Sequence, residues 1–310
     1  MTALAAGLVV LVAAACGPLL GRRDARGAAV LGAAVAAMLA CPLLLPREAP
    51  LFRVLVLFVS AMAGGKMLDY YLSGPHAGGS GAYFRYLVHP GGLDFPSSLR
   101  KPADVSRARE VRRLLGGLAA LACGVVSFAW LVTTRFASDS FPADHVAKMV
   151  AFGFTIEGVA CVSCAGARLA GFHAVPIVEL AFLARSPAEF WRRYNRLAGA
   201  WLYRHVFLPC GGRAHPLRAV LVTFLVSGAV HELLFAIALE RVTGYQLAFF
   251  GLHGIGVALS RPLDRLGRRP AGAAAAAAVH AAFLLATSVL FFASFAQVLP
   301  GFYSARPWLR

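Results

Sequence analysis

Charged residues are scarce in this chain of 310 residues. Asp, Glu, Lys and Arg together make up 14% of it, whereas 59% of the residues are hydrophobic and the mean hydropathy is +0.69. A soluble globular domain carries about 25% charged and about 45–50% apolar residues, and a disordered chain is more polar still. The composition therefore excludes disorder, argues against a soluble enzyme and favours a helical protein that crosses a membrane several times.

Acidic residues and lysine are the scarcest of all. Only 14 Asp and Glu stand against 30 Lys and Arg, of which three are lysine, and the formal net charge is +16. Nucleic-acid-binding proteins carry such charge as patches on a polar surface. Here the basic residues lie between apolar blocks instead, as membrane topology requires. We therefore expect membrane lipids, and no nucleic acid, among the partners.

Cysteine and histidine form no recognisable disulfide or metal pattern. Six cysteines do not make a disulfide framework in a chain this long and this apolar. Cys161 and Cys164 have redox spacing, but no second pair and no strand–helix–strand pattern accompanies them. The nine histidines include no His-x-x-x-His pair. We expect no metal site and no bound cofactor.

Eight apolar stretches meet or approach the roughly 20 residues that a helix needs to cross a bilayer core of about 30 Å. They cover residues 3–20, 27–45, 49–65, 114–133, 148–170, 217–239, 244–260 and 273–299. A further apolar piece, 172–184, is too short to span and contains Pro176 and Glu179, which indicates a re-entrant or interfacial segment. The predicted fold is all-α: a single membrane-embedded domain over residues 1–310, polytopic, with about eight transmembrane helices.

Basic residues are concentrated in alternate connections between these stretches. The connections 21–26, 66–113, 185–218 and 261–270 hold 22 of the 30 Lys and Arg residues. Because cytoplasmic loops are enriched in Lys and Arg, we expect these four connections in the cytoplasm and both termini outside, in a bacterial cytoplasmic membrane. The connections 66–113 and 185–218 are too long to be simple turns.

A helix is predicted to begin at Ser186. Ser186 and Glu189 have the spacing of a capping box, and Pro187 occupies the first helical position. One apolar, aromatic helical face follows, formed by Phe190, Tyr194, Leu197 and Trp201. Three basic residues lie largely off that face, namely Arg192, Arg193 and Arg196. Basic and aromatic residues together are typical of a helix at a membrane surface, so an interfacial anchor is one interpretation.

A polar stripe is predicted inside the span 217–239. Thr223, Ser227 and His231 are spaced by four residues, so they share one face of an otherwise apolar helix. Glu232 follows directly. Ionisable residues inside a membrane are costly and usually face a cavity or a partner. His231 alone is open to three interpretations: a packing residue, a proton relay or a catalytic group.

Several segments resemble the signature of the membrane-bound O-acyltransferases. Phe190–Asn195 (FWRRYN) and Trp201–Phe207 (WLYRHVF) look like the signature segment of that family, and Ser227–Leu233 (SGAVHEL) looks like its histidine-bearing span. Phe250–Gly254 (FGLHG) is similar to a following segment of the plant-type wax synthase branch. The resemblance is specific over residues 186–260.

This resemblance implies an acyltransferase that moves a fatty acyl group from acyl-CoA, its co-substrate, to the hydroxyl of a lipophilic alcohol. His231 corresponds to the catalytic histidine of the family and Asn195 to its second signature residue. The chemistry fits both residues: an alcohol needs a positioned base at neutral pH, and an amide can donate to the thioester carbonyl or orient the base. The residues expected to contact substrate are Thr223, Ser227, Trp191, Arg192, Arg193, Arg204, His205, Glu232 and His253.

The anionic phosphates of CoA give a physical reason for the basic residues around Asn195, namely Arg192, Arg193, Arg196 and Arg204. Lipid headgroups would fit the same residues equally well. The reacting carbonyl and hydroxyl must come within about 3–3.5 Å of each other. We therefore expect a cavity from the cytoplasmic face to His231, with Thr223 and Ser227 on its wall, and an acceptor that enters sideways from the bilayer.

Two other functions remain open at this point. One is a polytopic membrane transporter that uses His231 and Glu232 as a proton or substrate site, and the other is a non-catalytic membrane scaffold. A transporter favours broken helices in matched halves of the chain. A scaffold has no need of the stripe formed by Thr223, Ser227 and His231.

Overall fold

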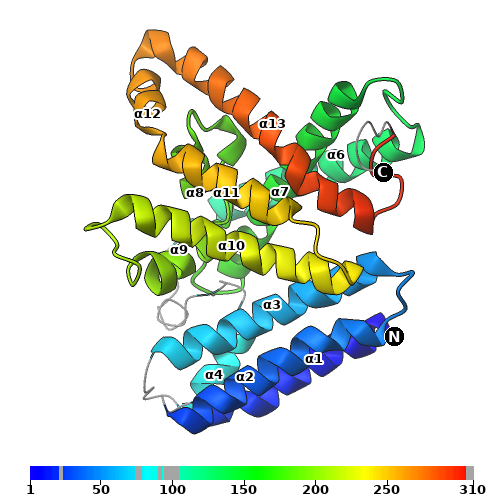
Figure 1. Ribbon diagram of the computed structural model, residues 1–310, viewed down its shortest axis with the longest axis vertical. Helices are drawn as coiled ribbons and strands as arrows, with labels where there is room; N and C mark the ends of the chain where they lie inside the picture. The colour runs from blue at the N-terminus through cyan, green and yellow to red at the C-terminus, as the bar shows by residue number, and fades with distance from the viewer. Residues whose placement is uncertain (21–23, 74–78, 90–92, 94–104, 305–310) are drawn as a thin grey trace.

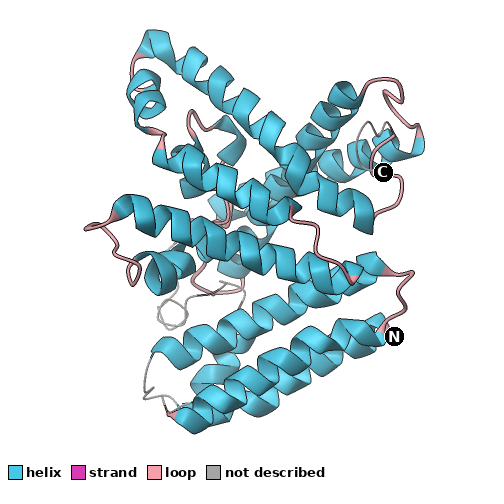
Figure 2. Ribbon diagram, viewed as in Figure 1, coloured by secondary structure: helices cyan, strands magenta, loops and turns pink. Residues whose placement is uncertain are grey.

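The computed structural model describes residues 1–20, 24–73, 79–89, 93 and 105–304. Helices connected by loops make up these residues, and no strand occurs among them (Figure 2). The predicted all-α class is therefore confirmed. The expectations about Arg22, Arg23, Arg100 and Lys101 fall outside the described residues.

Six helical segments are long and apolar enough to cross a membrane: Ala25–Leu44, Pro50–Ser73, Arg107–Thr133, Phe141–Leu169, Pro216–Leu239 and Pro270–Val298. They contain α2 (Ala25–Ala40), α3 (Pro50–Ser73), α6 (Arg107–Thr133), α7 (Phe141–Leu169), α10 (Pro216–Leu239) and α13 (Ala273–Val298). The other two predicted spans are shorter helices, α1 (Thr2–Cys16) and α11 (Tyr245–Ala258). At 1.5 Å per residue each is roughly 21–23 Å long, less than the bilayer core.

The first part of the chain forms a layer of its own. Helices α1, α2 and α3 lie side by side at the bottom of Figure 1, and the short helix α4 (Gly79–Val88) packs behind them. Val9, Met38, Met67 and Tyr83 form its interior and are each 0% exposed. The Tyr83 hydroxyl donates to the Ala13 carbonyl at 2.8 Å, so the polar atom of this buried side chain has a hydrogen-bond partner.

The second part is built around a helical hairpin. Helices α10 and α11 run side by side through the centre of Figure 1, and α13 crosses beside them. The helices between α7 and α10 are short. They include α8 (Pro187–Arg193), α9 (Arg196–Leu202) and a π-helical turn, η4 (Tyr203–Phe207). After α11 comes α12 (Arg261–Gly267). An aromatic core that includes Phe190 and Phe292 joins α7, α8 and α13.

Charged contacts at both ends of α3 hold the two parts together. At one end Arg53, 3% exposed, donates to Glu240 at 2.7 Å and to the Leu45 carbonyl. At the other end Asp69, 0% exposed, lies 3.2 Å from both Arg204 and His205 of η4. These two ends are about 24 Å apart along the helix. The stretch of α3 between Arg53 and Asp69 therefore packs against the second part of the chain.

The segment 172–184 is not a spanning helix, as its length predicted. It contains one short 3-10 turn, Ala181–Leu183, and is otherwise irregular. Its backbone pairs with the α8–α9 region: the Glu179 amide donates to the Arg193 carbonyl at 3.0 Å, and the Arg196 amide donates to the Ile177 carbonyl at 2.8 Å. The segment thus supports the chain where α8 ends and α9 begins.

Helices α6 and α7 approach each other closely because both carry glycine at their contact. A Cβ atom on Gly158 of α7 would lie 2.5 Å from the backbone nitrogen of Leu121 in α6. Small residues at helix contacts are the usual means of close approach in membranes. Gly166, on the same helix, has no atom within 4 Å of its Cβ position and is exposed.

We therefore expect Gly158→Leu to destabilise the protein by at least about 1–3 kcal/mol, because the obstacle is backbone and cannot move aside easily. Thermal denaturation of the purified protein in detergent measures the effect, and Gly166→Leu is the matched control. Equal melting temperatures for the two variants would contradict the close packing of α6 on α7.

Candidate active site

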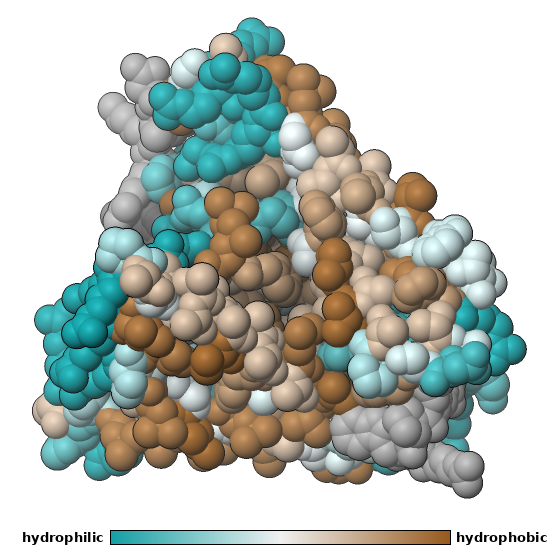
Figure 3. Space-filling view, turned by 90° about the horizontal axis from the view of Figure 1, so that it is seen from above, coloured by the Kyte–Doolittle hydropathy of each residue, from teal (hydrophilic) through white to brown (hydrophobic). Residues whose placement is uncertain are grey.

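A pocket of about 500 Å³ lies between the two parts of the chain. Its walls come from α3, α7, α8, α9, α10, α11 and α13 and are mainly aromatic and aliphatic. The face of the molecule in Figure 3 is hollowed among hydrophobic side chains, with hydrophilic ones toward its corners. A few polar side chains line the pocket: Tyr194, Asn195, Tyr203, Thr223, Ser227, His231 and Ser288. A volume of this size suits a lipid-like molecule held by apolar contacts.

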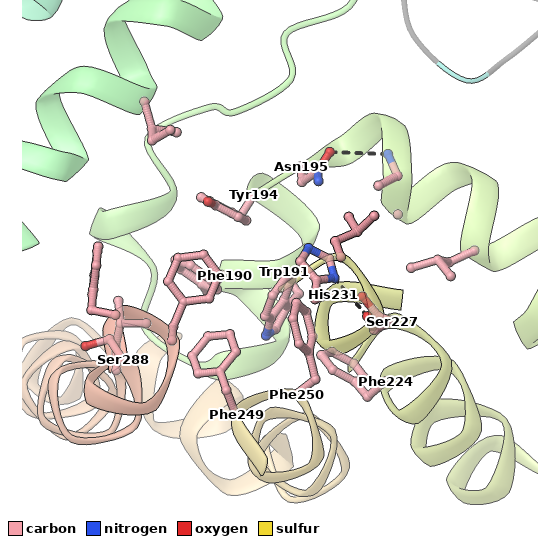
Figure 4. Close-up of a pocket in the computed structure, with 18 of the residues that line it drawn as sticks. Phe190, Trp191, Tyr194, Asn195, Phe224, Ser227, His231, Phe249, Phe250 and Ser288 are labelled. Carbon is pink, nitrogen blue, oxygen red and sulfur yellow. Dashed lines mark hydrogen bonds between the residues drawn. The ribbon is translucent and has the colours of Figure 1, made fainter. Parts of the chain in front are cut away.

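One ring nitrogen of His231 is hydrogen-bonded, and the other has no partner among the described residues. Its Nδ1 lies 2.8 Å from the Ser227 carbonyl, one turn earlier in α10 (Figure 4). Because a carbonyl oxygen only accepts, the neutral ring carries its proton on Nδ1, and Nε2 holds a lone pair. No described residue makes a hydrogen bond to Nε2. The Phe250 ring packs against the imidazole at 4.5 Å between centroids and restricts its orientation.

The rest of the polar stripe also faces the pocket. Thr223 and Ser227 both line it, as their spacing from His231 predicted. The Thr223 hydroxyl donates to the Ala219 carbonyl at 2.7 Å, so its proton is already engaged. Thr223 can therefore only accept a hydrogen bond from a ligand.

Asn195 interrupts the predicted surface helix. Its backbone adopts the left-handed conformation, with φ 45° and ψ 53°, and α9 begins directly after it. The expectation of one continuous helical face from Phe190 to Trp201 is therefore wrong. Asparagine tolerates this conformation better than most residues, and its Oδ1 accepts from the Ala198 amide at 3.4 Å, which caps α9.

This interruption brings the Asn195 amide to the pocket. Figure 4 shows Asn195 and His231 at the same end of it. Within the part of the chain that the structure describes, no acceptor holds the Asn195 Nδ2 group. An uncommitted donor thus lies on the same pocket as the free Nε2 of His231.

Tyr194 adds a second donor beside Asn195. Its ring stacks on Phe190, with 5.1 Å between centroids and 14° between planes. Burial raises the pKa of Tyr194 to about 12. The phenol therefore stays protonated at neutral pH and can donate into the pocket.

Glu232 has a structural role, although it was expected to contact substrate. It does not line the pocket. Its carboxylate is 7% exposed and accepts from the amides of Thr243, Gly244 and Gln246 at 2.6–3.0 Å, and from the Thr243 hydroxyl at 3.0 Å. These are the unpaired groups where α11 begins. Glu232 therefore closes the α10–α11 turn.

His253 is also outside the pocket lining. It is 0% exposed, and both of its ring nitrogens are bound: Nδ1 to the indole of Trp191 and Nε2 to the Thr287 hydroxyl, each at 2.9 Å. Trp191, by contrast, lines the pocket. The two residues are in direct contact, but only Trp191 can reach a ligand in the pocket.

Most of the arginines near Asn195 are already engaged. Arg193 pairs with Glu189, and Arg196 pairs with Glu179 at 2.6 Å. Arg192 is exposed, and no described residue forms an ion pair or hydrogen bond with it. It is thus the basic side chain of this segment with most freedom to meet an anionic ligand.

Arg204 and His205 converge on Asp69, which sequence reasoning missed. Their side chains lie 3.2 Å from its carboxylate, and the Tyr86 hydroxyl donates to the same group at 2.9 Å. The predicted third span ends at residue 65, which leaves Asp69 in the connection that follows it. Its position just after the apolar stretch 49–65 is the signal that could have indicated a functional or structural acidic residue.

Sequence reasoning also missed Ser288 and the α3 wall of the pocket. Ser288 lines the pocket, and its hydroxyl lies 3.0 Å from His145 Nε2. Val54, Leu57 and Phe58 of α3 line it from the other part of the chain. A serine or a phenylalanine in an apolar span carries no pattern that distinguishes it. Among the residues described, no three His, Cys, Asp or Glu side chains lie close enough together to hold a metal ion.

Comparison with known proteins identifies the family. The profile of the membrane-bound O-acyltransferase family (MBOAT) matches residues 122–295, more than half of the chain. This chain belongs to the membrane-bound O-acyltransferase family. The matched region holds α7 to α11 and most of α13, and so most of the pocket, whereas α3 lies outside it.

Several plant acyltransferases are similar to this MBOAT protein over part of their length. A probable long-chain-alcohol O-fatty-acyltransferase 2 of Arabidopsis thaliana is 32% identical over 108 residues, which are 32% of this chain and 32% of that protein. A probable long-chain-alcohol O-fatty-acyltransferase 3 of the same plant is 40% identical over 84 residues, 24% of this chain and 25% of that protein. Diacylglycerol O-acyltransferase 1C of Glycine max is 40% identical over 55 residues, 17% of this chain and 11% of that protein. The matched stretches thus cover a third or less of each relative.

The role of Glu232 can be tested by its effect on stability. We expect Glu232→Ala to lower the free energy of unfolding by about 1–3 kcal/mol, because buried donors lose a charged acceptor. Faster hydrogen exchange at Thr243 and Gly244 should accompany the loss. Glu48→Ala, at an exposed site, is the control. A fully stable Glu232→Ala protein with unchanged exchange would contradict the structural role.

Proposed function

We propose that this MBOAT protein transfers a fatty acyl group from acyl-CoA to the hydroxyl of a lipophilic alcohol, with His231 as the general base. The observation that carries the proposal is the free Nε2 of His231 on an apolar pocket that also holds the uncommitted amide of Asn195. Family membership and the names of the similar plant proteins support the same reaction class.

The reaction follows from the protonation state of these groups. The alcohol donates its hydroxyl hydrogen bond to Nε2, and the imidazole takes the proton as the oxygen attacks the thioester carbon. The Asn195 amide donates to the carbonyl oxygen, on which negative charge develops. The C–S bond then breaks, and the CoA thiolate takes the proton from the imidazolium. The products are the ester and free CoA, and no acyl-enzyme forms.

The acceptor is best described as a long-chain alcohol. The pocket lining is largely aromatic, which suits an alkyl chain. The relatives named as long-chain-alcohol acyltransferases match over 108 and 84 residues, whereas the diacylglycerol acyltransferase of Glycine max matches over 55. The wax-ester reaction therefore has more support than the acylation of diacylglycerol.

The CoA end of the donor belongs at the surface beside Asn195 in this proposal. Arg192 supplies an exposed cation there without an acidic partner among the described residues. The paired arginines, Arg193 and Arg196, offer less, since a phosphate would have to displace Glu189 and Glu179. Arg204 would have to leave the buried Asp69.

The transporter alternative loses one of its two residues. It required His231 and Glu232 to act as one proton or substrate site. The Glu232 carboxylate instead accepts four hydrogen bonds at the α10–α11 turn, away from the pocket lining. No observation in the described structure favours transport over acyl transfer.

An acyl-transfer assay tests the proposed function and the base together. Membranes that contain the protein, supplied with labelled acyl-CoA and a panel of alcohols, should form labelled ester. His231→Ala should lower the rate by roughly 10²–10⁴-fold, the usual contribution of a general base, while the protein still accumulates in the membrane. The exposed His215→Ala is the matched control.

Two results would count against this proposal in different ways. Wild-type protein that esterifies no member of the panel would remove the proposed function. An active wild type with an equally active His231→Ala variant would keep the function and remove His231 as its base.

We further propose that the pocket opens toward the cytoplasm in a bacterial cytoplasmic membrane. Arg185, Arg192, Arg193 and Arg196 lie together where α8 and α9 form the surface, and loops rich in arginine face the cytoplasm. The connection between α6 and α7 carries Asp139. It joins the end of α6 to the start of α7, and so lies at the opposite end of α7 from the segment that leads to α8. This orientation gives cytosolic acyl-CoA direct access.

Cysteine labelling tests this orientation. In a cysteine-free background, Arg192→Cys should react with a membrane-impermeant maleimide only after the membrane is opened, because its side chain faces the cytoplasm. Asp139→Cys, exposed on the opposite connection, should react in intact cells. The reverse pattern would place the α8–α9 surface outside and remove the access of cytosolic acyl-CoA.

A further inference from the structure

A chain of hydrogen bonds runs from the pocket wall into the core of the second part. The Trp191 indole lies 2.9 Å from His253 Nδ1, His253 Nε2 lies 2.9 Å from the Thr287 hydroxyl, and that hydroxyl lies 2.8 Å from the Phe283 carbonyl. The chain joins α8, α11 and α13, three elements far apart in sequence. It begins on the pocket and ends at a backbone carbonyl of α13.

The direction of every bond in this chain follows from chemistry. An indole N–H can only donate, so His253 Nδ1 must accept and carries no proton. The proton of the neutral ring therefore lies on Nε2 and is donated to Thr287. The Thr287 hydroxyl in turn donates to Phe283, whose carbonyl can only accept. All donors are satisfied, and neither imidazole nitrogen of His253 keeps a free lone pair.

This arrangement distinguishes His253 from His231, and both lie in the family-matched region. His231 lines the pocket, and its Nε2 has no partner among the described residues, whereas His253 is 0% exposed, lies outside the lining and has both nitrogens engaged. His253 can therefore neither take a proton from a substrate hydroxyl nor touch the substrate. What it determines is the position of Trp191.

Trp191 has neighbours that make its position important. Its ring packs against Phe224 at 5.3 Å and against Phe250 at 5.6 Å between centroids. Phe250 in turn packs against His231 at 4.5 Å. Trp191 also precedes Asn195 by four residues, at the end of α8. A shift of the indole would thus disturb both the base and the amide, and Figure 4 shows all five side chains around the pocket.

We propose that His253 is a positioning residue: together with Thr287 it anchors the Trp191 indole, which holds His231 and Asn195 in reacting geometry. This inference rests on the proposed acyl transfer. It assigns His253 no contact with substrate and no proton transfer. Its effect is on geometry, to which reaction rates are sensitive at the level of about 1 Å.

Two pairs of variants test the chain by kinetics. His253→Leu removes both hydrogen bonds, whereas His253→Gln retains one acceptor and a donor for them. Thr287→Val removes the acceptor for His253, and Thr287→Ser retains it. The Leu and Val variants should lose about tenfold to a hundredfold in kcat, with the KM for acyl-CoA close to wild type. The Gln and Ser variants should recover most of kcat and keep the wild-type pH profile.

A spectroscopic readout follows the anchor itself. In protein labelled with ¹⁵N-tryptophan, the indole signal of Trp191 is identified by its loss in Trp191→Phe. It should move to the position of a weaker hydrogen bond in His253→Leu and stay near wild type in His253→Gln. The exposed His215→Gln is the control for both measurements.

The outcomes separate this inference from the proposed function. A wild-type protein without acyl transfer would remove the proposed function, while the indole signal would still report whether the anchor exists. With an active wild type, a His253→Gln variant as impaired as His231→Ala would make His253 a proton-transfer group and overturn the positioning role. An unshifted Trp191 signal in His253→Leu would overturn it as well.

Discussion

Wherever a helix stops inside an apolar protein, its last backbone N–H and C=O groups need partners that lipid cannot supply. The charged residues of this chain are few, and several of them meet this need. The Glu232 carboxylate accepts hydrogen bonds from the backbone amides at the start of α11. The Lys66 ammonium donates to the carbonyls of Tyr86, Leu87 and His89 at the end of α4. Arg53 donates to the Leu45 carbonyl ahead of α3.

These contacts at the helix ends also determine how the helices are placed around the pocket. The turn held by Glu232 folds α11 back along α10, and this brings Phe250 against His231. Arg53 and Asp69 hold the two ends of α3, and the residues between them form one wall of the pocket. A cavity between separate helices needs such anchors. Without them the apolar surfaces would pack against each other and fill the cavity.

The polar groups of the pocket differ from these anchors in one respect. Each anchor has its partners within the protein, whereas His231 Nε2 and Asn195 Nδ2 have none among the described residues. Their other atoms are nevertheless fixed, by the Ser227 carbonyl and the Ala198 amide. Groups that are held in place and still free to bind are what a reaction with a developing charge requires. The proposed chemistry follows from this combination.

Helical content and the polar stripe could be predicted because both are local. The apolar runs and the four-residue spacing of Thr223, Ser227 and His231 indicate helices and a shared face without reference to the rest of the chain. The start of α8 at Ser186 was equally local: its side chain caps the Glu189 amide at 3.1 Å, as the capping box predicted. The segments that resemble the acyltransferase signature belong to the same level.

Contacts between distant segments could not be predicted in this way. Glu232 follows His231 in the sequence, yet its carboxylate turns to the amides of Thr243 and Gly244. Asp69 meets Arg204 from 135 positions away, and the break at Asn195 depends on backbone pairing with the segment that contains Ile177. The sequence by itself determined the all-α class, the resemblance to the family and the face that carries His231, because helical periodicity repeats every few residues. Only the tertiary structure decided which polar groups are used as anchors and which remain free at the pocket, because a donor or a charge is satisfied by whatever partner the folded chain brings within hydrogen-bonding distance.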